Sequence, residues 1–294
     1  MRTYNPKQPT DPRPEPLLRV LNLGAGTQST AVALLHLDGT LPPLDAAVFA
    51  DTGWEPQEVY DHLAKLRPVF VDAGVPLIEV SAGNIRKDAL GVTEGRTRFA
   101  SMPLFIDKEN GDKAAMGRRQ CTKEYKVEPI RRAILGLVAE RLGITAATWR
   151  NVPAGTYVEQ VFGISTDEVQ RARTPRDRWG INYYPLLSLG WRREDTISYL
   201  EAEGWAAPRS ACIGCPFHSN NEWRRLRDQR PDEWQDAVEF DQELRARASA
   251  ASGFDGTPYL HRSMRPLDLV DLTTAEEHGQ LGLFGDECEG MCGV

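Results

Sequence analysis

The stretch "LNLGAGTQSTAVALL" (residues 21–35) has the pattern of a strand that ends in a glycine-rich turn and continues into a helix. The backbone N–H groups of such a turn, together with the helix N-terminus, form an anion site that holds phosphate. The stretch lacks the lysine of the nucleotide P-loop and the third glycine of the dinucleotide fingerprint. A tight turn with glycine used only for packing is the alternative. The candidate phosphate-binding residues are Gly24, Gly26, Thr27, Gln28, Ser29 and Thr30.

Short apolar runs alternate with helical patterns on both sides of this stretch. Strands are expected at 17–23, 44–50, 76–80 and 157–165, and helices at 29–38, 56–73 and 128–142. This alternation predicts an α/β fold with a doubly wound, mostly parallel sheet and helices on both faces. The carboxyl end of the first strand, where the turn lies, is then the ligand-binding edge.

After residue 190 the pattern becomes mainly helical. Helices are expected at 192–204, 220–229 and 231–250, and residues 258–270 look irregular and extended. We expect a flexible proline-rich arm over 1–16, an α/β nucleotide-binding domain over 17–190, and a helical C-terminal part over 191–294 with a mobile cysteine-containing tail.

The composition is that of an ordinary globular protein, with 294 residues, 41% hydrophobic and 26% charged. No apolar run approaches the roughly 18 residues of a membrane span, and the N-terminus does not read as a signal peptide. We therefore expect a cytoplasmic protein with reduced cysteines and no membrane partner.

Positive charge gathers in two places despite a net charge of −7. Residues 113–132 hold seven Lys/Arg, and 171–178 hold four Arg. Solvated helix faces and phosphate coordination in a cleft both explain such runs. The candidates for phosphate coordination are Arg118, Arg119, Lys123, Lys126 and Arg171.

Two further segments favour a nucleotide site. "FADTGWEPQEVY" (49–60) puts Asp51, Thr52 and Gly53 at the end of the second strand, and "RRQCTKEYKVEPIRRAI" (118–134) puts basic residues and a cysteine ahead of a helix. Together with the turn, over residues 17–215, these segments resemble the adenine nucleotide α-hydrolase (PP-loop) superfamily, and within it the PAPS reductase branch. The resemblance implies a PP-loop fold that binds ATP, PAPS or APS, with Mg²⁺ as a candidate further ion.

The five cysteines form three groups, namely Cys121, the pair Cys212 and Cys215, and the tail pair Cys288 and Cys292. The Cys-x-x-Cys spacing of the middle pair suits a metal, an iron–sulfur cluster or a redox pair. "QCTKEYKVEP" resembles a segment of the APS reductases, with Gln120 in place of their first cysteine. That resemblance implies a [4Fe-4S] cluster on Cys121, Cys212 and Cys215, with either a tail cysteine such as Cys288 as fourth ligand or an iron left open.

The tail "DECEGMCGV" is similar to the Glu-Cys-Gly motif of the sulfonucleotide reductases. The resemblance implies catalytic roles for Cys288 and Cys292, as a nucleophile and a resolving thiol. A chain end whose cysteines have no role is the alternative. His218 and His261 are acid–base candidates, although a lone histidine is more often a structural hydrogen-bonding group.

Three functions compete. In the first, a PP-loop ATP pyrophosphatase activates an acceptor for sulfur transfer, with a nucleic acid or a sulfur-donor protein as partner. In the second, a sulfonucleotide reductase releases sulfite through its tail cysteine. In the third, the chain is a non-catalytic nucleotide- and cluster-binding subunit. The sequence favours the first and leaves the acceptor and the oligomeric state open.

Overall fold

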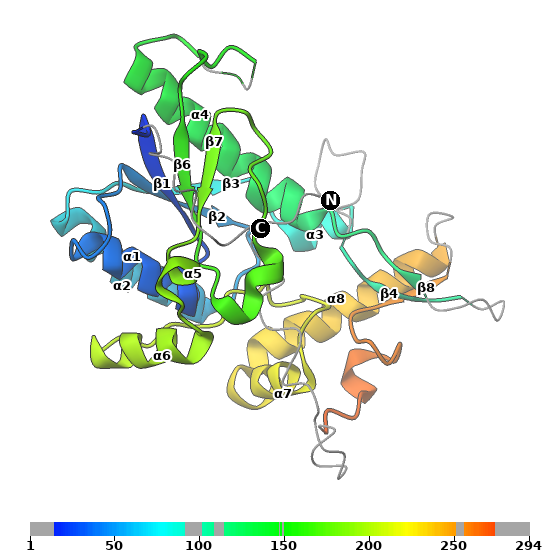
Figure 1. Cartoon of the computed structure of the whole chain (residues 1–294). Helices are drawn as coiled ribbons and strands as arrows, with labels where there is room; N and C mark the ends of the chain where they lie inside the picture. The colour runs from blue at the N-terminus through cyan, green and yellow to red at the C-terminus, as the bar shows by residue number, and fades with distance from the viewer. Residues whose placement is uncertain are drawn as a thin grey trace.

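Five parallel strands form the central sheet (Figure 1). They are β1 (Leu18–Leu23), β2 (Ala46–Asp51), β3 (Leu77–Ser81), β6 (Val158–Val161) and β7 (Gly180–Tyr183), in the order β3-β2-β1-β6-β7. The register pairs Val20 with Ala46 on one side of β1 and Leu18 with Val158 on the other. The computed structural model describes residues 15–91, 102–108, 115–146, 148, 150–250 and 256–273.

Helices cover both faces of this sheet. On one face lie α1 (Thr27–Leu37) and α2 (Gln57–Asp72), which bury Val32 and Leu63 against the strands. On the other lies α4 (Glu128–Leu142), which buries Ile134 and Val138. The predicted fold class, an α/β fold with a doubly wound parallel sheet, is therefore confirmed.

A second core lies beside the sheet and joins segments that are distant in the chain. It is built from α3 (Ile85–Ala89), a π-helical turn (Thr122–Val127), α7 (Asn220–Gln229), α8 (Pro231–Ala250) and a small antiparallel sheet of β4 (Phe105–Asp107), β5 (Ala115–Met116) and β8 (Thr257–Tyr259). Tyr125, Trp223 and Phe240 are among its most deeply buried side chains. The domain division at residue 190 stays a prediction.

The remaining elements are short. α5 (Pro185–Leu189) follows β7, and α6 (Arg193–Ala202) packs its Leu200 against α1. Two 3₁₀ turns span Thr166–Arg171 and Leu267–Leu269, the second within the stretch expected to be irregular. No helix among the described residues is long and apolar enough to cross a membrane.

The strand order places the topological switch point of the sheet beside the glycine-rich turn. On one side of β1 lie β2 and then β3, and on the other side lie β6 and then β7. The carboxyl ends of β1 and β6 therefore flank the topological switch point, which is where open α/β sheets bind ligands. The segments there are residues 24–26 and 162–165.

Candidate active site

The glycine-rich turn is stabilised by its own serine. Ala25 adopts a left-handed conformation (φ +56°), and Gly26 precedes the first residue of α1. The Ser29 hydroxyl accepts a hydrogen bond from the Gly26 N–H (3.2 Å) and donates to the Gly26 carbonyl (3.1 Å). The single proton of this hydroxyl is therefore used within the turn. What the turn offers a ligand is backbone N–H groups of the first helical turn.

Thr30 lies beneath the turn and contacts a neighbouring helix. Its side chain is fully buried, and its hydroxyl lies 2.8 Å from Nε2 of His62 on α2. Burial, and to a smaller extent the charge of Lys65, lowers the pKa of His62 to about 4. The Thr30–His62 contact thus joins α1 to the neighbouring helix.

Gln28 bridges the switch point. Its side-chain amide donates to the Ser165 hydroxyl (2.9 Å) and to Glu168 Oε2 (2.8 Å), both in the segment after β6. Glu168 also accepts from Arg171 (2.7 Å), and burial raises its pKa despite these two partners. Glu168 thus links Arg171 to Gln28 of the glycine-rich turn.

The glycine-rich turn packs closely against two other segments of the chain. A Cβ on Gly163, just after β6, would lie 2.7 Å from the Ser29 nitrogen, so only glycine fits there. A Cβ on Gly26 would lie 3.1 Å from Ser210 Cβ and 3.3 Å from its nitrogen. The residues preceding Cys212 therefore lie directly on the glycine-rich turn.

The loop after β2 contacts the buried Cys212. The Thr52 hydroxyl donates to Glu55 Oε1 (2.9 Å), and Cys212 Sγ lies 3.3 Å from that hydroxyl and 3.6 Å from the carboxylate. Lys126 Nζ lies 3.5 Å from the same Glu55 oxygen. The other oxygen, Oε2, is buried without a hydrogen-bond partner in the described part of the chain. This loop thus places an acid and a hydroxyl against one thiol, and the π-helical turn adds an amine that pairs with the acid.

Asp51 and Gly53, on either side of Thr52, stabilise the conformation of this loop. Asp51 Oδ1 accepts from the Gly53 N–H (2.7 Å) and from the Tyr60 hydroxyl (2.9 Å). Burial, with the adjacent Asp51, raises the pKa of Tyr60. Gly53 has φ +70°, and its carbonyl accepts from Asn84 (2.6 Å). Asp51 and Gly53 therefore hold the loop in shape here.

Three cysteines line one pocket of about 400 Å³, part of it open to solvent. Cys212 and Cys215 are buried and Cys121 is half-buried. The remaining lining residues are Thr52, Ile85, Met102, Pro103, Arg119, Thr122, Lys126, Pro216 and Phe217. We call this the thiol pocket.

The thiol pocket suits an iron–sulfur cluster in the kind of ligands it offers. Three thiols face it, and Arg119 and Lys126 supply positive charge near the thiolates that a cluster requires. Within the described ranges, however, no three His, Cys, Asp or Glu side chains converge as they would around a metal ion. A bound cluster would therefore draw the three cysteines closer together.

Arg119, in the lining of the thiol pocket, has a hydrogen-bond donor without a partner among the described residues. Its guanidinium lies 5.3 Å above the Phe217 ring, and its Nη2 is buried with no hydrogen-bond partner among the described residues. The neighbouring Arg118 and Lys123 are exposed. Of the basic residues singled out between 113 and 132, Arg119 and Lys126 line the pocket.

Trp54 fixes the Cys212–Cys215 turn, and the sequence did not single it out. Its carbonyl accepts from the Ile213 N–H (3.0 Å). Its ring occupies the space that a Cβ on Gly214 would need, with the nearest ring carbon 2.0 Å away. A tryptophan directly after Asp51-Thr52-Gly53 and a glycine between two cysteines were the available signals.

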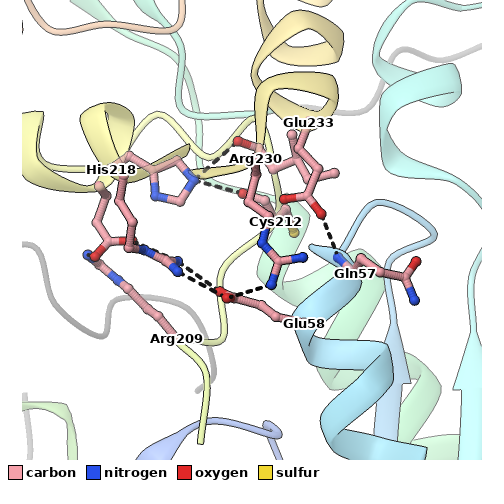
Figure 2. Close-up of polar contacts among 10 residues, drawn as sticks. Gln57, Glu58, Arg209, Cys212, His218, Arg230 and Glu233 are labelled. Carbon is pink, nitrogen blue, oxygen red and sulfur yellow. Dashed lines mark hydrogen bonds and ion pairs between the residues drawn. The ribbon is translucent and has the colours of Figure 1, made fainter. Parts of the chain in front are cut away.

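A polar network lies behind the same turn (Figure 2). His218 Nε2 contacts the carbonyls of Cys212 (3.0 Å) and Ile213 (3.2 Å). Glu58 pairs with Arg225 (2.8 Å) and Arg230 (3.4 Å). Further contacts join Arg209 to Glu222 (3.1 Å) and the Gln57 N–H to Glu233 (2.8 Å). These bonds attach the start of α2 to α7 and α8.

The tail cysteines, Cys288 and Cys292, lie outside the described residues, so their predicted roles stay predictions. His261, the other histidine singled out, bonds to Asn220 (3.1 Å) and Ser263 (2.8 Å). It is held by structural hydrogen bonds away from the thiol pocket.

No protein-family model matches the sequence, and no curated protein is significantly similar to it. Solved structures that are similar to the chain include the U34-tRNA thiolase NcsA from Methanococcus maripaludis with its [4Fe-4S] cluster. The identity is 12%, the match covers 78% of this chain and 73% of that chain, and the TM-score is 0.36. A likeness this distant says nothing about activity.

Proposed function

We propose that this protein binds an adenine nucleotide at the turn of residues 24–30 and uses the thiol pocket for nucleotide-dependent sulfur transfer to an acceptor. One observation carries the proposal. The segment 208–215 packs Ser210 on Gly26 and, two residues later, places Cys212 against the loop after β2. A phosphate bound at the turn would therefore lie near the thiols, because Ser210 and Cys212 belong to the same short segment.

The groups around the thiols suit this chemistry. The buried Nη2 of Arg119 needs an acceptor, and an anionic oxygen on the nucleotide or the acceptor would supply one. Such a donor stabilises negative charge that develops as a phosphate leaves. Glu55 lies beside Cys212 and pairs with Lys126, so an acid and an amine are close to this thiol.

We propose that Cys121, Cys212 and Cys215 hold an iron–sulfur cluster in this pocket. When bound, such a cluster supplies a site for sulfur or for electrons. The chain's own residues bind the nucleotide, neutralise charge and exclude water with apolar side chains such as Ile85 and Met102. A nucleic acid or a sulfur-donor protein is the proposed partner.

Products distinguish the competing activities. With ATP and an acceptor, sulfur transfer by this route releases pyrophosphate, whereas a sulfonucleotide reductase releases sulfite from PAPS or APS. We expect pyrophosphate from the anaerobically purified full chain. Sulfite release instead would replace the proposed activity with reduction. Binding of nucleotide without either product would indicate a non-catalytic subunit.

Gly26→Val is expected to abolish adenine-nucleotide binding, measured by calorimetric titration of the full chain. Two effects contribute, because the side chain covers the N–H groups of the turn and also collides with Ser210. The double variant G26V/S210G removes the Ser210 Cβ and so relieves the nearest collision. We expect it to recover stability in urea but not nucleotide binding. Recovered binding would mean that the turn is only structural.

Removing residues 286–294 is expected to leave iron in place and to eliminate turnover, if Cys288 or Cys292 is a nucleophile. Iron analysis and product release are measured on the same preparation. Loss of iron would instead assign a tail cysteine as a cluster ligand. Full iron with full turnover would exclude the tail from the mechanism.

A further inference from the structure

Several backbone groups of the Cys212–Cys215 turn are hydrogen-bonded. The Cys215 N–H donates to the Cys212 carbonyl (3.0 Å), and the His218 N–H donates to the Cys215 carbonyl (3.1 Å). The Ile213 N–H donates to Trp54 (3.0 Å). The carbonyls of Cys212 and Ile213 are hydrogen-bonded to the side chain of His218.

His218 binds these two carbonyls through one nitrogen (Figure 2). Nε2 lies 3.0 Å from the Cys212 oxygen and 3.2 Å from the Ile213 oxygen. A carbonyl only accepts, so Nε2 carries the proton and donates to both. Nδ1 is buried and has no hydrogen-bond partner in the described ranges. The contact to the turn therefore depends on one identified atom of the ring.

The imidazole is itself held in place. Its ring meets the fully buried Trp223 edge to face, with centroids 4.6 Å apart. Arg209 and Glu222, which pair with each other, line a small cavity beside it. A side chain locked by packing on one side and by charges on the other can hold a loop in one conformation.

We propose that His218 is a positioning residue: its Nε2–H fixes the Cys212–Cys215 turn so that both thiols face the pocket. The inference rests on the proposed function only in that these are the thiols this function uses. His218 itself contacts backbone, and it acts on the thiols through the two carbonyls.

Two amide variants separate the ring nitrogens. In His218→Gln the amide nitrogen reaches about as far as Nε2, whereas in His218→Asn it reaches only as far as Nδ1. Rates of alkylation of Cys212 and Cys215 by iodoacetamide are measured by peptide mass spectrometry on the metal-free full chain. We expect His218→Asn to react about tenfold faster than wild type, because loss of the hydrogen bond to the turn makes the local opening that exposes the buried thiols more frequent, and His218→Gln to stay within about twofold.

Cd²⁺ alone supplies a spectroscopic readout. Its thiolate charge-transfer band is titrated in each variant, and we expect an affinity about tenfold lower in His218→Asn, with recovery in His218→Gln. His261→Asn is the matched control, since His261 lies in the same half of the fold and bonds elsewhere. It should leave both thiol readouts unchanged.

Equal behaviour of the Gln and Asn variants in both readouts would overturn the inference, because the ring would then only fill space. If the Asn variant does not fold, ¹⁵N NMR of the wild-type His218 ring decides, and a proton on Nδ1 instead of Nε2 would overturn it. A wild type without any Cd²⁺–thiolate band would contradict the proposed function, while the alkylation rates would still test His218.

Discussion

A Gly214→Ala variant is expected to displace the Cys212–Cys215 turn and to destabilise the protein. The new Cβ would lie 2.0 Å and 2.4 Å from two ring carbons of Trp54. This ring cannot readily move away, because its Nε1 donates to Asp236 (2.5 Å) and the ring packs against Phe240 with centroids 4.6 Å apart. Overpacking of a buried contact costs about 1–3 kcal/mol, or more where neither partner can move.

The loss is measured as the midpoint of urea unfolding, together with the alkylation rates of Cys212 and Cys215. Gly136→Ala is the matched control, because Gly136 lies within α4 and a Cβ there meets no atom within 4 Å. That change should leave the thiols unaffected and stabilise the helix by up to about 1 kcal/mol. A Gly214→Ala variant with unchanged midpoint and thiol reactivity would disprove the packing of Trp54 on this turn.

The sheet and its main helices could be predicted because their signals are local. Apolar runs mark β1, β2 and β3, and the spacing of Val59, Leu63, Leu66 and Phe70 marks the buried face of α2. β7 was missed because this half-exposed edge strand of only four residues has no continuous apolar run. The expected strand 157–165 is shorter in the structure, since Gly163 turns the chain against α1.

The site could be predicted only in its parts. The thiols were identified, but the contact of Cys212 with Thr52 joins residues 160 positions apart, and Gln28 meets Glu168 across 140. No local pattern encodes such pairs. Trp54 was not identified, and His218 was considered only as an acid–base candidate, because the contacts of both with the Cys212–Cys215 turn arise from tertiary structure.

Replacing either Cys212 or Cys215 with alanine is expected to remove the iron from anaerobically purified protein. Both thiols are buried in the thiol pocket, so no solvent ligand easily replaces a lost thiolate. Wild-type protein should be brown, with a broad charge-transfer absorption and stoichiometric iron and sulfide, and both variants should be colourless.

Ser210→Ala is the control for this experiment, since it lies two residues from Cys212 but carries no ligand atom suited to iron. It should keep its colour.

Cys121→Ala tests the third thiol, which is half-buried and comes from a different segment. If Cys121 is a ligand, the iron content of Cys121→Ala falls as far as that of the Cys212 and Cys215 variants. If only Cys212 and Cys215 are ligands, Cys121→Ala stays coloured. A colourless wild-type protein that contains zinc would refute the cluster, because thiolates of one Cys-x-x-Cys and a third cysteine would then hold a single metal ion.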